Sequence, residues 1–185
     1  MSRKAVRLAI QTYLQNYGLT YVGTVYPARP IIVTEDAYYQ TMQGQAIQAS
    51  QAGSAAVLVI NFSQDDRTRE ADAGRGAVQD KVVHQTVIEV WFASPVPTPV
   101  NVTQQITDPA VQAQLDYDDV IESIFVAIRR NATPGGGKIV WSFGEFTAGI
   151  SHQQLLPITA AQGMAITIHG IITVEAWEWI AGIGV

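Results

Sequence analysis

Hydrophobic positions recur with helical spacing in two stretches of the chain. In Lys4–Tyr17 the spacing i, i+4, i+7, i+8 places on one helical face Val6, Ile10, Tyr13, Leu14 and Tyr17. In Pro109–Arg130 a similar face is formed by Tyr117, Ile121, Ile124, Phe125 and Ile128. Asp108 suits the N-cap of this second helix and Pro109 its first turn. The pattern predicts a short opening helix and one long helix near residues 109–130.

Other apolar stretches have the length and composition of strands. Ala55–Phe62 is a continuous apolar run, as expected of a strand buried on both faces, and Lys81–Phe92 is longer and rich in β-branched residues. Leu19–Tyr26 and Ile139–Phe146 are also predicted strands. The segment Thr34–Gln51 stays ambiguous, because its first residues favour a helix start while an internal glycine and a Gln/Ala run weaken a long helix.

The last predicted strand, Met164–Glu178, alternates between apolar and polar positions. One face would carry Met164, Ile166, Ile168, Ile172 and Val174. The other would carry Thr167, His169, Thr173 and Glu175. Such alternation is typical of a strand with one core face and one face that is exposed or covered by a partner.

Helices and strands do not alternate regularly along this order of elements. We therefore predict an α+β fold, with a mixed, mostly antiparallel sheet and helices packed on one face. No internal repeat or domain boundary is visible, so 1–185 is expected to be a single domain.

Two long polar or proline-rich segments separate the elements. Gln64–Asp80 is predicted to be a long charged loop, of a length that is often functional in compact domains. Ser94–Thr107 carries prolines in alternation and should cross the surface in extended form.

Composition favours a protein surface that other subunits cover. Charged residues make up 15% of the chain, against about 25% in typical soluble domains. The net charge is −5 and no basic stripe is present, which argues against sequence-specific nucleic-acid binding. The chain has no cysteine, and its apolar runs are too short to span a bilayer, so we expect a soluble protein without disulfides.

No catalytic, cofactor or metal site emerges from the motifs. The histidines form no H-x-x-x-H pair, and there is no G-x-S-x-G elbow and no phosphate-binding glycine loop. We therefore expect no enzymatic activity. Two alternatives stay open: an enzyme with a strand-borne site of His84, His169 and Glu175, or a small ligand-binding domain that uses Trp177 and Trp179. The two tryptophans share one strand face, which suits a binding platform, a subunit contact or packing under the first helix.

The order of these elements resembles the tail-terminator and neck family of long-tailed bacteriophages. The resemblance covers most of the chain: the opening helix, the strand that ends at Tyr26-Pro27, the strand Ala55–Phe62 with the pair around Gln64–Asp80, the lone long helix, and the closing strand Gly163–Glu178. The chain departs from that pattern in its Ala/Gln segment Tyr39–Ala52 and in Ser94–Thr107.

The resemblance implies a structural virion protein that forms a ring, typically a hexamer. Such a ring caps the tail tube, stops its polymerisation and joins it to the head-side connector; it is found in the virion and, during assembly, in the host cytoplasm. A head-completion, head–tail joining or minor tail protein is the alternative within this class. The charged segment and the strand edges supply the candidate subunit-interface residues, which are Arg67, Arg69, Glu70, Asp72, Arg75, Trp177 and Trp179.

Overall fold

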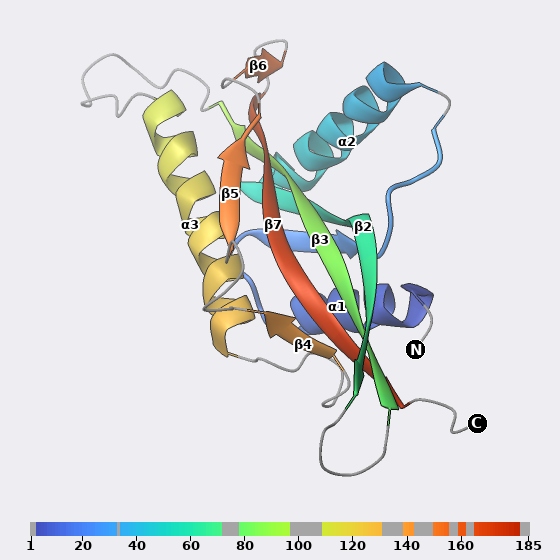
Figure 1. Ribbon diagram of the computed structural model, residues 1–185. Coiled ribbons are helices and arrows are strands. Elements are labelled where there is room, and N and C mark those ends of the chain that lie inside the picture. The colour runs from blue at the N-terminus through green and yellow to red at the C-terminus, as the bar shows by residue number, and fades with distance from the viewer. Residues whose placement is uncertain are drawn as a thin grey trace, which may run out of the picture.

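The computed structural model describes residues 3–32, 34–71, 78–96, 109–130, 139–142, 150–155, 159–161 and 165–181 (Figure 1). The elements, in chain order, are α1 (Arg3–Asn16), β1 (Val22–Tyr26), α2 (Glu35–Ala49), the 3-10 helix η1 (Ser50–Ala52), β2 (Ala55–Ala71), β3 (Val78–Pro95), α3 (Pro109–Arg130), β4 (Ile139–Ser142), β5 (Ser151–Gln154), β6 (Thr159–Ala161) and β7 (Ala165–Ala181).

One mixed sheet organises the chain, in the order β1-β2-β3-β7-β4. Among the strands that the structure describes, only the β1–β2 pair is parallel; β2–β3, β3–β7 and the pairs that β4, β5 and β6 make with β7 are antiparallel. The three short strands pair with successive stretches of the same edge of β7. The α+β class and the mixed, mostly antiparallel sheet are therefore confirmed.

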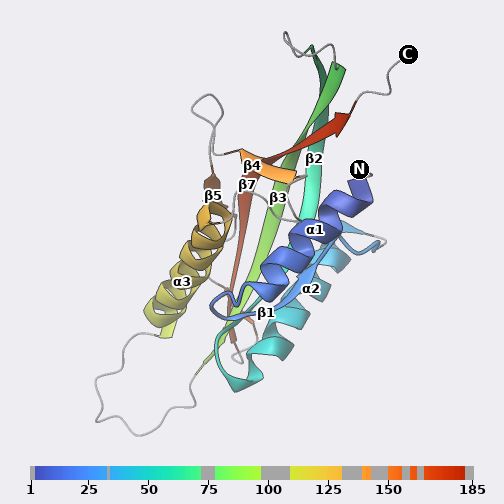
Figure 2. The same cartoon turned by 90° about the horizontal axis from the view of Figure 1, so that it is seen from below.

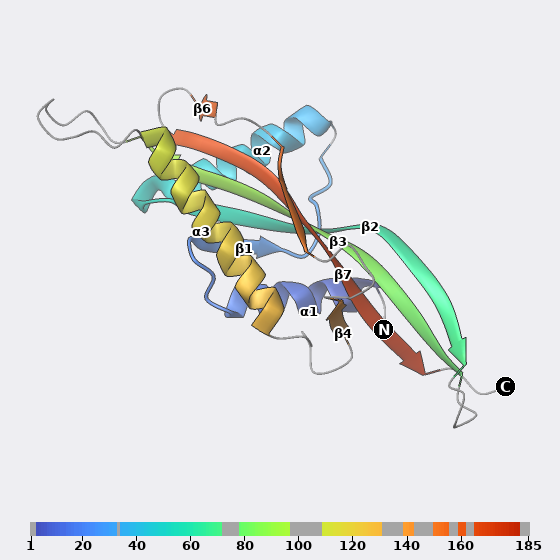
Figure 3. The ribbon, with the colours of Figure 1, turned by 60° about the vertical axis from the view of Figure 1, so that its left-hand side comes forward.

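Helices cover both faces of this sheet, where we had expected them on one (Figure 3). Even-numbered residues of the long strands, such as Leu58 and Ile88, form one apolar cluster with α1 and α3. Odd-numbered residues, such as Val57 and Trp91, form a second cluster with α2. The physical reason is the continuous apolar run of β2, which exposes hydrophobic side chains on both sides of the sheet and so needs two covers.

The two predicted amphipathic helices occupy nearly the predicted residues. The buried side of α1 is Val6, Ile10 and Leu14, and Gly18 ends the helix region with a φ of +77°. In α3 the predicted apolar positions are buried except Phe125, which is half-buried against the cluster. The Tyr13 hydroxyl donates to the Ala127 carbonyl at 2.7 Å and joins the C-terminal halves of the two helices.

The ambiguous segment 34–51 is helical. The Thr34 hydroxyl accepts a hydrogen bond from the Ala37 amide at 3.2 Å and caps α2. Three residues of α2 are buried on the sheet: Tyr38, Met42 and Ala46. Gly44 lies in the helix without ending it, because burial of this apolar face outweighs the lower helix propensity.

Candidate subunit interface

The three long strands run on together beyond the helices as an arm. We define the arm as residues 64–71 of β2, 78–85 of β3 and 175–181 of β7, which pair in register from Gln64↔Gln85 and Gln85↔Glu175 outward. Figure 3 shows this end of the sheet extending past α1 and α3, with only β4 beside it. The arm is thus a paired sheet whose base is still buried, at His84 and Ala176, and whose outer end extends past the helices.

The predicted charged loop at 64–80 is wrong in most of its length. Residues 64–71 belong to β2 and 78–80 to β3, and they pair with each other up to Ala71↔Val78. Residues 72–77 lie outside the described residues. The segment was mistaken for a loop because it lacks the apolar alternation of a strand that covers a core, and an uncovered arm has no core to cover.

Five of the seven candidate interface residues lie in the arm. Arg67 pairs with Val82, Arg69 with Asp80 and Glu70 with Gln79 in the β2–β3 register. Trp177 and Trp179 lie across β3 from them, paired with Val83 and Lys81. Asp72 and Arg75 fall outside the described residues. The structure therefore brings residues far apart in sequence onto one small sheet, with β3 between them.

One edge of the arm is open within the part of the chain that the structure describes. β1 pairs with β2 only from Ala56 to Val59, and no described strand pairs with the outer edge of β2 beyond that point. Arg3 reaches this edge at its base, where its guanidinium donates to the Phe62 carbonyl at 3.2 Å. The opposite edge is covered, because β4 pairs with residues 175–178 of β7. An unpaired strand edge offers amides and carbonyls to another chain.

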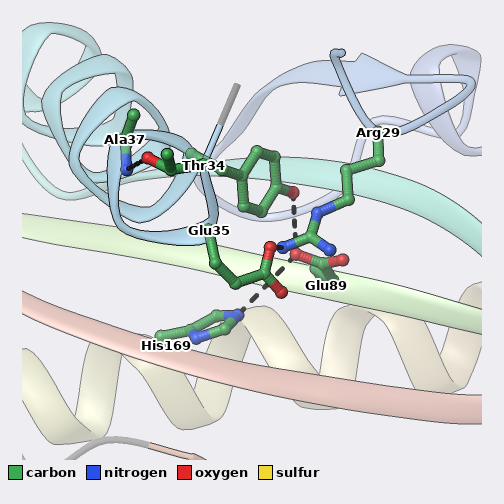
Figure 4. Close-up of polar contacts among 7 residues, drawn as sticks. Arg29, Thr34, Glu35, Ala37, Glu89 and His169 are labelled. Atoms are coloured by element: carbon green, nitrogen blue, oxygen red, sulfur yellow. Dashed lines mark hydrogen bonds and ion pairs between the residues drawn. The ribbon is translucent and has the colours of Figure 1, made fainter. Parts of the chain in front are cut away.

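A buried polar cluster lies on the α2 side of the sheet, centred on Glu89 of β3 (Figure 4). The Tyr38 hydroxyl donates to the Glu89 carboxylate at 2.7 Å, and His169 Nε2 lies 4.0 Å from it, beyond hydrogen-bond distance. The His169 ring stacks on Trp91 with centroids 3.6 Å apart. Arg29 lies over the Tyr38 ring at 3.8 Å and pairs with Glu35 at 2.7 Å. We call these residues the Glu89 cluster.

Burial sets the protonation states in the Glu89 cluster. Desolvation, with a smaller effect from the nearby Arg29 charge, lowers the pKa of His169 to about 4, so the ring is neutral at pH 7. Desolvation and the hydrogen bond to Glu89 raise the pKa of Tyr38. Among the described residues, neither ring nitrogen of His169 has a hydrogen-bond partner, and a cavity of about 50 Å³ adjoins it. The arrangement is a packed layer between sheet and helix, with room for a few solvent molecules at most.

Sequence reasoning missed this cluster, although one signal was available. Glu89 interrupts an otherwise apolar run, and a carboxylate in a strand buried on both faces requires a partner. Its partner Tyr38 comes from the segment whose structure was left ambiguous.

The structure does not bring together His84, His169 and Glu175. His169 pairs with Trp91, seven residues along β3 from His84, a separation of about 24 Å. The two histidines also lie on opposite faces, since the His84 ring stacks on Phe62 on the α1 side at a centroid distance of 5.1 Å. Glu175 lies six residues from His169 along β7, about 20 Å away. These three side chains do not form a common site.

A hydrogen bond between Tyr117 and His152 crosses β7 at a glycine. The Tyr117 hydroxyl and His152 Nε2 are 2.8 Å apart, and a Cβ on Gly170 would overlap with that hydroxyl. The glycine inside an otherwise regular strand was the signal for this close approach. The contact ties β5 to α3 beside the middle of β7.

No group of three or more His, Cys, Asp or Glu side chains in the described ranges is placed to hold a metal ion. Among the described helices, none has both the length and the apolar character needed to cross a bilayer.

Comparison with known proteins gives no family for this chain: no family model matches its sequence, and no curated protein matches it.

Proposed function

We propose that this chain is a structural virion protein of a long-tailed phage: a tail terminator whose copies form a ring, typically a hexamer, that caps the tail tube, stops its polymerisation and joins it to the head-side connector. The ring would contact the tail tube protein on one side and the connector on the other.

The arm is the observation that carries this proposal. Its strands, of 17, 18 and 17 residues, are far longer than the usual strand of about 5–6 residues, and their outer ends extend past the helices (Figure 3). A sheet that no helix covers and that has an unpaired edge is costly for an isolated molecule. In an assembly, a neighbouring copy can cover its face and pair with its edge.

The residue types of the arm and the composition support the same reading. Arg67, Arg69 and Glu70 give this part of β2 charges of both signs, and such charges select register and partner between identical subunits. The charged fraction of 15% suits a protein whose surface is largely covered in its assembly. The order of the elements, with one long helix between a long hairpin and a closing strand, also resembles that of the family named above.

Two measurements test the proposal. Light scattering on the purified chain should give the mass of a closed ring of copies. Added to tail tube protein that is polymerising, the ring should stop growth at one end of the tubes, as counted by electron microscopy. Binding to a head-side ring with no effect on tubes would instead identify a head-completion protein, and a monomer inert toward both would refute the proposal.

A triple substitution tests the role of the arm itself. Replacing Arg67, Arg69 and Arg75 by alanine should leave the unfolding temperature within a few degrees of the native one and reduce the ring to smaller species. The matched control replaces the exposed Arg129 and Arg130, at the end of α3, and should assemble normally. Unchanged assembly of the triple variant would remove these side chains from the interface.

A further inference from the structure

Two grooves flank Leu8 on the outer side of α1, away from the sheet. Leu8 is 40% exposed, which is unusual for so large an apolar side chain. The first groove, of about 490 Å³, is lined by Leu8, Ala9, Thr12, Tyr13, Asn16 and Tyr17. The second, of about 460 Å³, is lined by Arg3, Lys4, Arg7, Leu8, Pro27 and Ala28. One side of α1 thus offers an apolar groove that continues, across Leu8, into a basic one.

The basic groove concentrates positive charge in an acidic protein. Three of the 11 lysines and arginines of the chain line it, whereas the net charge is −5. Arg3 and Arg7 are held against the Phe62 ring, at 5.6 and 4.8 Å from its centroid, and Lys4 is exposed one turn before Leu8. An apolar surface with this rim suits a partner that combines apolar and acidic side chains.

The outer side of α3 carries that combination. Val111 and Leu115 are 51% and 53% exposed and lie one turn apart. The next two turns of the same side expose the acidic residues Asp118, Asp119 and Glu122. The apolar part therefore comes first along α3 and the acidic part follows, three to seven residues after Leu115, or about 4–10 Å along the axis.

On α1 the order is reversed at a similar spacing. Lys4 and Arg3 precede Leu8 by four and five residues, about 6–8 Å along the axis. When the two helices are set antiparallel with Leu8 beside Leu115, the acidic residues of α3 meet the basic groove. Within one molecule this contact cannot form, because α1 and α3 already touch at Tyr13 and Ala127, and Leu115 lies about 18 Å along α3 from that point.

We propose that the outer side of α3 in one copy docks, antiparallel, on the grooves of α1 in the next copy. Leu115 packs beside Leu8 in the apolar groove, and Asp118, Asp119 and Glu122 face Lys4 and the basic groove. The two surfaces differ, so the contact is head-to-tail and leaves a free surface of each kind for a further copy, as closing a ring requires. Both helices are visible in Figure 2. The inference rests on the proposed function in one respect, since both need copies of the chain to associate.

Charge reversal provides the test. Lys4→Glu and Asp119→Lys should each weaken self-association at least tenfold in sedimentation analysis, because like charges then face each other across the contact. The double variant Lys4→Glu/Asp119→Lys restores opposite charges and should associate within about threefold of the native chain. Circular dichroism and the unfolding temperature establish that each variant is folded.

Asp36→Lys is the matched control, because it makes the same charge change at an exposed position of α2, on the other face of the sheet. It should associate like the native chain. If the native chain forms rings and the two single variants form them equally well, the docking is wrong while the proposed function stands. If the double variant fails to recover association, the pairing of Lys4 with Asp119 is likewise wrong. A native chain that stays monomeric alone and with tail tube protein would refute both.

Discussion

The same three strands build two regions that differ in everything except their backbone pairing. In the body of the molecule, β2, β3 and β7 lie between α2 on one face and α1 with α3 on the other, and their side chains are buried on both sides. In the arm, the strands go on pairing after a register shift between Phe62 and Gln64, and their outer ends extend past the helices. Pairing and burial are therefore separate properties of this sheet.

The difference shows which property stabilises the fold. Net stabilisation by a backbone hydrogen bond is about 1 kcal/mol, because it replaces bonds to water, whereas burying a large aliphatic side chain contributes roughly 1.5–3 kcal/mol. The body should thus hold most of the folding free energy. The arm contributes less to folding stability, so its residues and its open edge can be used for contacts with other chains.

The largest effect is expected in the body. Ile88→Ala removes a fully buried side chain from the cluster between the sheet and the helices α1 and α3, and should lower the free energy of unfolding by about 2–5 kcal/mol. Urea denaturation followed by tryptophan fluorescence measures it. Gln48→Ala, on the exposed side of α2, is the control and should change the free energy by less than about 0.5 kcal/mol. A loss below about 1 kcal/mol for Ile88→Ala would show that the body is not the stable region.

A nearly equal effect should follow from acidification, through His169. Its pKa falls from the ordinary 6.5 to about 4 on folding, so the unfolded chain binds the proton more readily. Stability is full above pH 6.5, declines as pH falls from 6.5 to 4, and loses about 3 kcal/mol in total over that window. Denaturation at pH 7 and pH 4 measures the difference, and His169→Gln should reduce it.

His152 provides the comparison for this pH dependence, because burial lowers its pKa as well, although its side chain is more exposed. His152→Gln should leave most of the decline between pH 6.5 and 4 in place. If it removed the decline and His169→Gln did not, the titrating group would lie on the α3 side of the sheet and not in the Glu89 cluster.

A smaller effect is expected where α2 begins. Thr34→Ala removes the cap that accepts from the Ala37 amide and should cost about 1 kcal/mol, while Thr34→Ser keeps the hydroxyl and should cost a few tenths. Thermal unfolding of the two variants gives the comparison. Equal stability of the two variants would mean that the packing of α2 on the sheet does not depend on its N-cap.

The smallest effect on stability is expected in the arm. Arg69→Ala lies in the β2–β3 register opposite Asp80, and should change the free energy of unfolding by less than about 0.5 kcal/mol. Urea denaturation under the conditions used for Ile88→Ala measures it. A loss comparable to that of Ile88→Ala would abolish the distinction between body and arm.

The body could be predicted well from sequence because its elements follow periodic patterns. The run Ala55–Phe62, the helix 109–130 and the alternating strand near the C-terminal end all appear where periodicity placed them. The burial of both faces of β2 was also predicted. A second buried face requires a second covering helix, which is α2. This helix was left ambiguous because Gly44 and its Gln/Ala-rich sequence give no clear helical pattern.

The arm and the Glu89 cluster could not be predicted in the same way. Residues 64–71 pair as a strand through backbone groups that every sequence has, so their charged side chains carry no periodic sign of it. The Glu89 cluster joins Arg29 and Tyr38 to strand residues far away in the chain, and such contacts follow from the packing of α2. The candidate interface residues were chosen for their charge and aromatic character, and their role stays a prediction.

The position of β7 has a consequence for how the chain can fold during synthesis. β3 pairs with it along one edge, and β4, β5 and β6, all earlier in the chain, pair with it along the other. A nascent chain that has emerged only as far as β6 lacks the strand to which four of its strands must attach. Local helices and the β2–β3 hairpin can form on the ribosome, but the sheet closes only when β7 arrives. Such long-range closure is slow, and until then β3 has a bare edge that a chaperone or a neighbouring nascent chain can bind.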